Sequence, residues 1–392
     1  MKILISGGGI AGLTAAFWLK KNGWTPVIAE KAPSLRKEGY MIDFFGSGWD
    51  VAERMGLAGA LRKERYAIQN FAFVDRQGKP YFRVPVQWIF DSLQGRYNYL
   101  LRGDLEKILW ERVKEEVEIR FGTSIKQLNS FSEREVIAVF ENGQEEAFDC
   151  VFGADGVHSK VRELVFGPEQ KFSRYLGYYV AAFTVPDRYG LSRDVMIYQE
   201  PDRQAGFYPL EEGVLATAYI FKSPDLGFVP PEERKEKLRE VFQGAGWITE
   251  RALEDIPEGE PIFFDSLTQI RMNSWSSDRT VLLGDACACL TLMAGQGASM
   301  AMAEAYVLCR ELNKNPRNFS EAFRRYENFF KPIIAKKQRQ AGKFSRHFVP
   351  GTSCRIALRR FWTRLAMSRL FLPLTMKFFG AKSILKAFPP ET

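Results

Sequence analysis

Three glycines early in the chain have the types and spacing suited to binding a phosphate group. Gly7, Gly9 and Gly12 form the pattern G-x-G-x-x-G, in which the first glycine permits a sharp turn, the second lets a pyrophosphate approach the backbone, and the third lets a helix pack closely against a strand. The unpaired N–H groups at the start of that helix attract phosphates. About twenty residues further on, the carboxylate of Glu30 can accept hydrogen bonds from ribose hydroxyls. The pattern predicts an adenine dinucleotide and, alone, leaves NAD and FAD open.

A βαβ unit must position these residues. The hydropathy pattern predicts a short buried strand over residues 2–6, a helix over 13–22 and a second strand over 26–30. The glycines then occupy the turn between the first strand and the helix, and Glu30 ends the second strand. This context distinguishes a nucleotide site from an ordinary glycine-rich turn.

Two later segments contain residues that favour FAD. In residues 99–110, Arg102 follows an apolar strand end, and Asp104 is expected to cap the N-terminus of an amphipathic helix. In residues 148–165, a predicted strand leads into a glycine-flanked turn that holds Asp155. An acid held in such a turn can orient other groups by hydrogen bonds.

Residues 278–308 form another strand-turn-helix segment. A buried strand ends at Gly284-Asp285, and Gly295 and Gly297 open a long helix rich in alanine and methionine. Asp285 can accept a hydrogen bond from a ribityl or ribose hydroxyl, and the positive end of the helix favours the negative charge of a reduced flavin. Each segment alone is compatible with any α/β protein. Together, in this order, the three favour an FAD site.

The composition is that of a globular protein in a reducing compartment. With 392 residues, of which 46% are hydrophobic, the chain can bury a large core and is long enough for two domains. Its five cysteines form no C-x-x-C pair and its two histidines are too few for a zinc site, so no metal site is predicted. The first strand begins directly after Met1 and no stretch approaches eighteen consecutive apolar residues, so we expect neither a signal peptide nor a membrane span. A cytoplasmic location fits best.

At these motifs the sequence resembles the class A flavoprotein monooxygenases with the para-hydroxybenzoate hydroxylase fold, including their tetracycline-inactivating and ubiquinone-biosynthesis branches. The resemblance covers residues 1–345 in ordered pieces. It implies an α/β fold with a Rossmann-like FAD-binding domain, an inserted β-rich substrate domain and a C-terminal helical region. The expected domains are FAD-binding residues 1–75, 99–175 and 271–345, substrate-domain residues 76–98 and 176–270, and basic amphipathic C-terminal helices over 346–392.

The resemblance also implies the residues of the cofactor site. Asp155 matches a motif linked to both FAD and NAD(P)H, and Arg102 matches the arginine that reaches the cofactor phosphates. One departure concerns the loop at the flavin face, where many members read G-D-A-A-H followed by a proline. This chain has Ala288 and then Thr291-Leu292, which leaves oxygen insertion open. The full expected FAD-binding set is Gly7, Gly9, Ile10, Ala11, Gly12, Glu30, Lys31, Arg102, Ile125, Asp155, Gly284, Asp285, Gly295, Gly297 and Ala298.

The reaction that the resemblance implies is hydroxylation. In this family NAD(P)H reduces the flavin, and O2 then forms a C4a-hydroperoxide that transfers one oxygen atom to an electron-rich substrate. We expect a largely apolar substrate of aromatic, polyene or polyketide type. Asp43 resembles the acid near the flavin ring in the tetracycline-acting branch and is the candidate catalytic carboxylate, with a loop-capping role as its alternative. Two rival functions stay open: a reductase, dehydrogenase or cyclase of the same fold without oxygen insertion, and a membrane-associated flavin-binding protein without turnover.

The middle region of the chain must supply the substrate pocket. Strand-like runs over residues 176–270 predict an antiparallel sheet, and such a sheet covering the flavin would build an apolar pocket. Aromatic residues are the candidate lining, although each is also suited to plain core packing. They are Phe73, Tyr81, Phe82, Tyr198, Phe207 and Tyr208.

The C-terminal region contains all of the excess positive charge. The net charge is +8, and residues 328–390 contain fourteen Lys and Arg and no Asp or Glu. Leu358, Trp362, Leu365 and Leu370 give basic amphipathic helical turns. We expect these helices to pack their apolar face into the core with their arginines solvated; the alternative is a peripheral contact with an anionic membrane. Nucleic-acid binding is not predicted, because the aromatic and basic residues are not interleaved on a strand platform.

Overall fold

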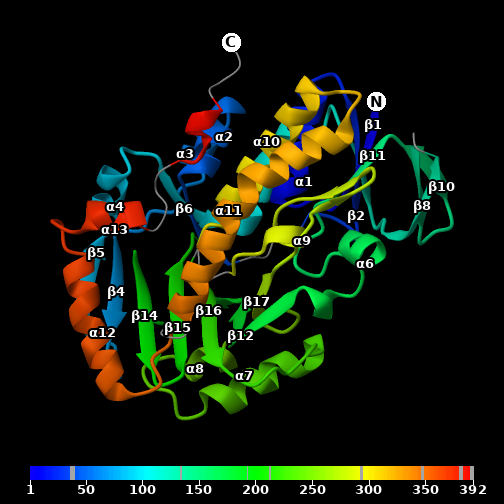
Figure 1. The fold of residues 1–392 in the computed structure, drawn as a ribbon. Helices are drawn as coiled ribbons and strands as arrows, with labels where there is room; N and C mark the ends of the chain where they lie inside the picture. Colours follow the sequence, from blue (N-terminus) through cyan, green and yellow to red (C-terminus); the bar gives the residue numbers. More distant parts are fainter. Residues whose placement is uncertain are drawn as a thin grey trace.

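The computed structural model shows two layers, an α/β layer above a large sheet, joined by one long helix toward the C-terminus (Figure 1). Leu292 lies outside the described residues. It is one of the residues at which this sequence differs from the G-D-A-A-H motif and its following proline. The residues that the structure describes are 1–35, 40–132, 135–191, 193–211, 213–291, 295–345, 348–378 and 383–388.

A six-stranded sheet forms the centre of the upper layer. Its order is β18 (Ser276–Ser277), β19 (Thr280–Leu282), β11 (Cys150–Gly153), β1 (Lys2–Ser6), β2 (Thr25–Glu30) and β7 (Glu118–Phe121). The pairings from β19 through β7 are all parallel, so the carboxyl ends of these strands meet at one edge although they come from distant parts of the chain. Ligands of open parallel sheets bind at that edge.

Helix α1 (Ile10–Lys21) covers β1 and β2 of this sheet and contacts two further helices. It packs against α10 (Gly297–Lys314) and against α5 (Arg102–Val113). A side sheet of β8 (Ile125–Ser132), β9 (Glu135–Phe140) and β10 (Glu145–Phe148) extends from it. One buried cluster joins the side chains of these helices and strands into the core of the layer.

The predicted elements around the motifs are confirmed with small shifts, apart from the role given to Asp104. Helix α1 begins at Ile10, three residues before the predicted start, with Gly9 as its N-cap. Helix α5 begins at Arg102, so Asp104 lies inside its first turn and the prediction that it is the N-cap is wrong. Asp104 instead accepts a hydrogen bond from Leu101 N at 3.1 Å, which satisfies an N–H at the helix start.

An eight-stranded sheet forms the lower layer. Its main path is β17 (Phe263–Ile270), β12 (Ser173–Ala182), β16 (Val214–Lys222), β15 (Arg203–Pro209), β14 (Asp194–Glu200), β4 (Asn70–Val74) and β5 (Pro80–Pro85), with β13 (Thr184–Pro186) on β16. The predicted antiparallel sheet of the middle region is confirmed. The boundary predicted after residue 75 is wrong, because it separates β4 from its partner β5. The other domain boundaries stay predictions.

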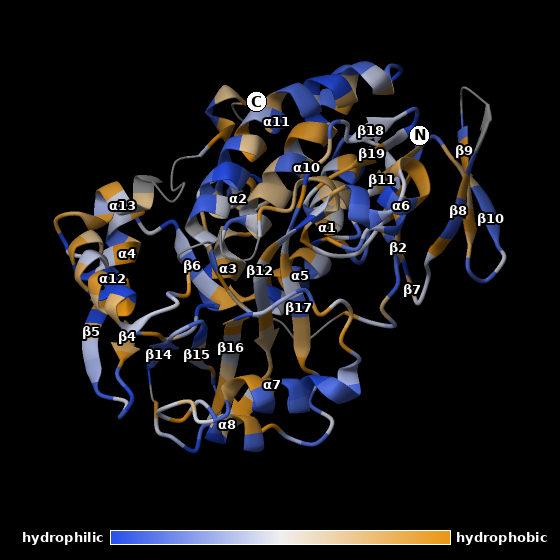
Figure 2. Cartoon of the chain, turned by 60° about the horizontal axis from the view of Figure 1, so that its bottom comes forward, coloured by the Kyte–Doolittle hydropathy of each residue, from blue (hydrophilic) through white to orange (hydrophobic). Residues whose placement is uncertain are grey.

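The two faces of this sheet have different cores. On one face, α7 (Arg234–Phe242) and α8 (Arg251–Glu254) cover a cluster that includes Phe207 and Tyr219. Figure 2 shows hydrophobic residues on parts of α7 and α8, which lie below the central strands in this view. The other face is covered by the pair β3 (Met41–Phe45) and β6 (Tyr97–Leu101) and by α4 (Val86–Ser92).

The long helix α11 (Phe319–Ser345) crosses from the upper to the lower layer (Figure 1). The buried side-chain amide of Gln338 donates to Ile270 O of β17 at 2.7 Å and to Cys289 O at 3.0 Å. Because Cys289 directly follows α9 (Asp285–Ala288), this one side chain links both layers. None of the helices in the described ranges is both long and apolar enough to cross a membrane.

The expected packing of the C-terminal helices is wrong for α12 (Ser353–Ala366). Leu358, Phe361 and Trp362 are 59%, 61% and 57% exposed, and Ile356 is the residue of α12 that is buried. The helix therefore does not place its apolar face in the core. The physical reason lies in its arginines, which supply the contacts with the protein body.

Candidate active site

The turn between β1 and α1 is too tight for side chains at two of the three glycines. Gly7 has φ +104°, and a Cβ there would lie 2.5 Å from Ala154 O of the β11 turn. A Cβ on Gly12 would lie 1.9 Å from Gly7 O. The first and third glycines therefore have the structural roles predicted for them, because the backbone of the turn occupies the space that a Cβ needs.

The start of helix α1 lies beside Arg102, which forms an ion pair with Glu106. Gly9 is the N-cap and no side chain caps the helix, so N–H groups of the first turn are available for an anion. A Cβ on Gly9 would lie 3.5 Å from Arg102 Nη2. That guanidinium also contacts Glu106 Oε1 at 2.8 Å. Burial opposes its charge, but Glu106, Tyr40 and nearby carboxylates outweigh burial and raise the pKa of Arg102, which stays a cation.

Glu30 is held in place by backbone N–H groups at the end of β2. Its two carboxylate oxygens accept hydrogen bonds from Gly8 N at 2.6 Å and Ala32 N at 2.8 Å. The chain before Ile125 passes beside it, because Thr123 N donates to Glu30 O at 3.0 Å. Ile125 itself is buried in the hydrophobic core and Lys31 is exposed, so their expected cofactor contacts stay predictions.

Asp155 stabilises the turn between β11 and α6 (Lys160–Phe166). Its carboxylate accepts hydrogen bonds from Ser159 Oγ at 2.5 Å, Val161 N at 3.0 Å and Ser6 Oγ at 3.3 Å. Burial raises the pKa of Asp155 and these bonds oppose that rise. Asp155 therefore connects the end of β1 to the start of α6 and shapes the wall beside Gly7.

Asp285 stands opposite the start of α10. It begins α9, and a Cβ on Gly297 would lie 3.9 Å from its Oδ1. Its side chain is exposed to solvent. The surrounding protein nevertheless raises the pKa of Asp285 by desolvation, and the positive charge of Arg102 opposes that rise.

The buried carboxylate of Glu304 accepts a hydrogen bond from the Gly284 turn. Gly284 has φ +64°, and its N–H donates to Glu304 Oε2 at 2.7 Å. The hydroxyl of Tyr326 donates to the same oxygen at 3.1 Å. Burial raises the pKa of Glu304 to about 8. The position of Asp285 therefore depends on a hydrogen-bond network within α10 and α11.

Together these residues fit FAD. The structure brings Gly9, Glu30, Arg102, Asp155 and Asp285 to the carboxyl edge of one sheet from five separate segments. The glycine turn, the uncapped start of α1 and the adjacent Arg102 are suited to binding a pyrophosphate. The carboxylates of Glu30 and Asp285 are suited to accepting hydrogen bonds from hydroxyl groups. Sequence reasoning missed Glu106, Glu304 and Tyr40, although Glu106 lies one helical turn after Arg102 and could have been found from that spacing.

The comparisons with known proteins decide the family. The profile of the FAD binding domain family matches residues 1–328. A flavin-dependent monooxygenase of Legionella longbeachae is 32% identical over 342 residues, which cover 86% of this chain and 87% of that protein. The chain belongs to the class A FAD-dependent monooxygenases.

Two solved structures support the fold of this monooxygenase over nearly its full length. The tetracycline destructase Tet(51) superposes with a TM-score of 0.83 at 27% identity and covers 98% of both chains. Klebsiella pneumoniae HpxO, solved with FAD and uric acid, has a TM-score of 0.80 at 19% identity and covers 97% of both chains. The predicted α/β fold and FAD cofactor are confirmed, and NAD(P)H is the reductant typical of this family.

Asp43 lies among tyrosines between the two layers of the monooxygenase. The hydroxyl of Tyr97 donates to Asp43 Oδ1 at 2.5 Å. Tyr99 is the direct cross-strand partner of Asp43, and its ring centroid is 6.1 Å from that of Tyr208 on β15. Burial raises the pKa of Asp43, and the hydrogen bond from Tyr97 opposes that rise.

The predicted aromatic lining is divided between different parts of the lower layer. Tyr208 and Phe82 pack into the cluster on the Asp43 side. Phe207 lies in the opposite cluster, so its expected pocket role is wrong, and Tyr198 stands on the same face of the sheet because its ring packs near Trp247 of that cluster. The alternation of β-strand side chains explains this division.

The remaining two aromatics lie at the edge of the sheet. The rings of Phe73 and Tyr81 are 6.4 Å apart, and α12 covers Tyr81. Sequence reasoning missed Tyr97 and Tyr99, which lie beside Asp43. Their signal was their alternation in the strand directly before Arg102.

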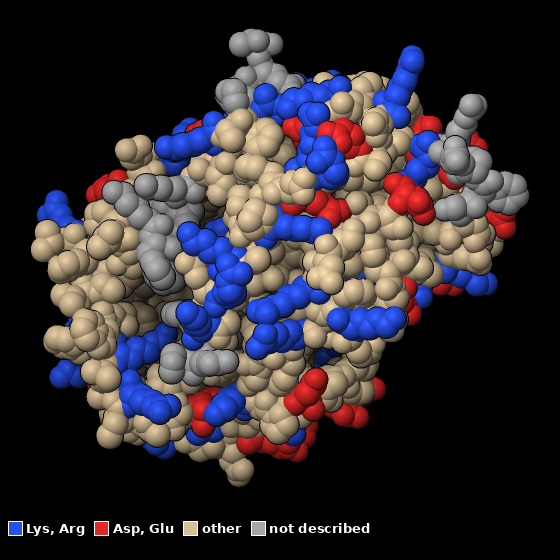
Figure 3. Space-filling view, viewed as in Figure 1, with Lys and Arg blue, Asp and Glu red and all other residues tan. Residues whose placement is uncertain are grey.

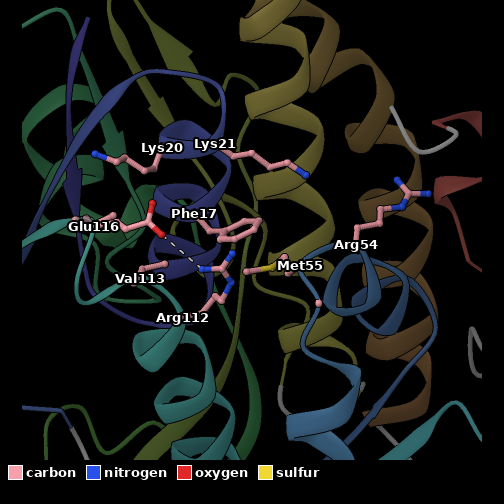
Figure 4. A pocket seen from close by; sticks show the side chains of 10 residues that line it. Phe17, Lys20, Lys21, Arg54, Met55, Arg112, Val113 and Glu116 are labelled. Atoms are coloured by element: carbon pink, nitrogen blue, oxygen red, sulfur yellow. Dashed lines mark ion pairs between the residues drawn. The ribbon is translucent and has the colours of Figure 1, made fainter. Parts of the chain in front are cut away.

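A surface pocket of about 370 Å³ lies away from this site. It is formed at the carboxyl ends of α1, α2 (Ser47–Arg54) and α5, with Phe17 and Met55 among its lining residues. Figure 4 shows Lys20, Lys21 and Arg112 around it, with Arg112 paired to Glu116. The pocket is at the end of α1 opposite to Gly9, so it is separate from the FAD site.

Proposed function

We propose that this monooxygenase hydroxylates a largely apolar small molecule of aromatic, polyene or polyketide type, with O2 as the oxygen donor and NAD(P)H as the reductant. The observation that carries the proposal is the group formed by Asp43, Tyr97, Tyr99 and Tyr208. It combines one carboxylate with three aromatic side chains between the flavin layer and the substrate sheet. Mostly apolar surroundings with a few placed polar groups are typical of small-molecule sites.

FAD, when bound, supplies the oxygen chemistry. Gly9 and Arg102 would hold its phosphates, and Glu30 and Asp285 would accept hydrogen bonds from its hydroxyl groups. The tyrosine rings around Asp43 exclude water and pack against the substrate. The bond from Tyr97 fixes Oδ1 of Asp43, which leaves Oδ2 to hold or accept a proton of a substrate hydroxyl.

Support for the substrate class comes from a solved structure whose name states its activity. Tet(51) is a tetracycline destructase and shares 27% of its sequence and 98% of its length with this chain. Tetracyclines are fused-ring compounds with phenolic and enolic hydroxyls. A substrate of that type would place a hydroxyl at Asp43 and its rings against the tyrosines.

We propose that the enzyme acts in the cytoplasm. All five cysteines are free, four of them buried and Cys354 exposed. Free buried cysteines are typical of a reducing compartment. The same compartment supplies NAD(P)H.

The test is an anaerobic absorbance experiment followed by turnover in labelled oxygen. The FAD-loaded protein is mixed with NADPH, with and without tetracyclines, polyphenols and quinols, and the flavin bands are followed. We expect one compound class to accelerate bleaching and its product to contain one oxygen atom from ¹⁸O₂. Bleaching with an unlabelled product would refute hydroxylation and favour a reductase or cyclase of the same fold.

A matched pair of variants tests the role of Asp43. Asp43→Asn should keep FAD content and lower substrate-dependent kcat/KM at least about tenfold, because a positioned proton carrier contributes 10²–10⁴-fold. Asp91→Asn, on an exposed position of α4, is the control and should behave like the wild type. Equal activity of both variants would remove Asp43 from the proposal.

A further inference from the structure

Helix α12 turns its hydrophobic face away from the protein. Leu358, Phe361, Trp362 and Leu365 follow one another at i, i+3, i+4 and i+7, and their exposed fractions are 59%, 61%, 57% and 40%. Residues at this spacing form one stripe along a helix. In a helix at the surface of a globular protein such a stripe normally faces the core, so its orientation here is reversed.

The arginines of the same helix make the contacts with the body of the protein. The guanidinium of Arg360 lies 3.9 Å from the ring centroid of Tyr81, and Arg364 Nη2 donates to Tyr81 O at 2.5 Å. Arg359 donates to Phe348 O, and burial lowers the pKa of Arg359. Figure 1 shows α12 running along β4 and β5 at the edge of the large sheet. Stacking and backbone contacts of guanidinium groups thus take the place of apolar packing.

The exposed stripe continues beyond α12. Leu370, Phe371 and Leu374, at the start of α13 (Leu372–Phe378), are 81%, 41% and 66% exposed. We call these three residues and the four of α12 the outer face. It contains seven of the ten exposed large hydrophobic residues in the described chain, and Figure 2 shows hydrophobic segments on both helices at the rim of the molecule. A concentration of this kind marks an interaction surface.

The positive charge beside the outer face indicates which kind of partner binds it. Arg355 and Arg369 are exposed beside the outer face, and residues 328–390 contain no Asp or Glu. Figure 3 shows Lys and Arg side chains among uncharged residues on this flank. A second copy of the chain, joined through the same face, would bring arginine against arginine. An apolar stripe flanked by arginines fits an anionic lipid surface.

We propose that α12 and α13 bind the enzyme to an anionic lipid bilayer. The outer face enters the boundary between headgroups and acyl chains, Trp362 lies at headgroup level, and Arg355 and Arg369 meet lipid phosphates. On the inner side of the same segment, Leu372 is buried against the cluster that contains Tyr97. The bilayer contact therefore adjoins the wall of the Asp43 site, although the proposal does not depend on which substrate is used.

The test is sedimentation of the FAD-loaded full chain with vesicles. We expect binding to vesicles that contain phosphatidylglycerol, weaker binding to pure phosphatidylcholine, and a loss of binding as salt is added. Phe361→Ser/Trp362→Ser should lower the partition coefficient more than tenfold at unchanged FAD content. The control is Phe228→Ser, which removes a hydrophobic residue that is 81% exposed outside the outer face and should bind like the wild type.

Charge variants separate the electrostatic contribution to vesicle binding from the hydrophobic one. Replacing Arg355 or Arg369 by Gln should each lower the partition coefficient roughly fivefold, because neither side chain is among the arginines that hold α12 to β5. Equal binding of the wild type to charged and neutral vesicles would overturn the proposal. So would a salt-resistant dimer in light scattering that the Phe361→Ser/Trp362→Ser variant abolishes without any vesicle binding by the wild type.

Discussion

Tyr97 and Asp43 form a 2.5 Å hydrogen bond between diagonal positions of two antiparallel strands. The direct partner of Asp43 in this pair is Tyr99, and Tyr97 is opposite Phe45. Long aromatic side chains reach diagonal neighbours on one face of a sheet. The hydroxyl of Tyr97 therefore partly compensates the desolvation of a half-buried carboxylate at the expected substrate site.

Removing that hydroxyl should shift the proton affinity of Asp43. In Tyr97→Phe, burial acts without the opposing hydrogen bond, so the pKa of Asp43 rises further. A hydrogen bond to a charged group contributes about 1.5–3 kcal/mol, which corresponds to at least about one pKa unit. We expect the acid limb of the kcat/KM profile to move upward by that amount. Tyr99→Phe is the control, and an unmoved limb in both variants would contradict a role of Asp43 in turnover.

A side chain at Gly9 should exclude the pyrophosphate. Gly9→Leu fills the space between the start of α1 and Arg102, where even a Cβ lies 3.3 Å from Glu106 Oε1. We expect a loss of FAD affinity of at least about tenfold, since the contacts of a buried phosphate are removed. Gly59→Ala, where a Cβ meets nothing within 4 Å, is the control. Yellow Gly9→Leu protein with wild-type FAD stoichiometry would refute the assignment of the phosphate site.

The buried Glu304 should make stability depend on pH. Its pKa is raised from 4.5 to about 8 in the folded protein, so the folded state binds the proton more tightly than the unfolded state. Its contribution is complete below pH 4.5 and is lost as the pH rises to about 8, at about 1.4 kcal/mol per pH unit. Glu304→Gln keeps an acceptor for Gly284 N and should remove this slope.

Urea unfolding at pH 5.5 and pH 8 measures the effect. Relative to wild type, Glu304→Gln should become more stable by on the order of 3 kcal/mol at the higher pH. The exposed Glu258→Gln serves as the comparison. The same difference between wild type and Glu304→Gln at both pH values would show that Glu304 does not titrate in this range.

His158 should stay protonated at neutral pH. Hydrogen bonds with Asp265 and Glu169 raise the pKa of His158 to about 10, at Nε2–Oδ1 and Nδ1–Oε1 distances of 3.5 and 3.1 Å. Because this pKa is raised, the stabilisation is complete below about pH 6.5 and disappears as the pH rises toward 10. The side chain is 64% exposed, so we expect His158→Gln to cost less than about 1 kcal/mol at pH 6.

Nuclear magnetic resonance can measure this protonation directly. The chain has two histidines, and the His158→Gln variant assigns their imidazole signals. One histidine should remain cationic at pH 8. A midpoint near pH 6.5 for His158 would mean that Asp265 and Glu169 do not hold it in solution.

The cofactor site was largely predictable because its signals are local. The three roles of Gly7, Gly9 and Gly12 follow from backbone geometry within one turn, and each acid ends a strand whose hydropathy pattern is clear. The helix start at Arg102 was missed because Asp104 suits either the N-cap or the first turn. Glu106 was missed although its i,i+4 spacing from Arg102 was a local signal. Glu304 was missed because its burial and its bonds to Gly284 and Tyr326 exist only in the assembled layers.

The sequence by itself determined the FAD-binding motifs, the parallel strands that carry them and the basic character of the C-terminal helices. Tertiary structure decided that Tyr97 and Tyr208 face Asp43 while Phe207 faces away. It also decided that α12 packs through Arg360 and leaves Trp362 outside. The spacing of apolar residues along a helix predicts which residues share a face. The direction of that face depends on the surface it meets, and here the guanidinium of Arg360 stacks on Tyr81 where an apolar side chain would otherwise pack.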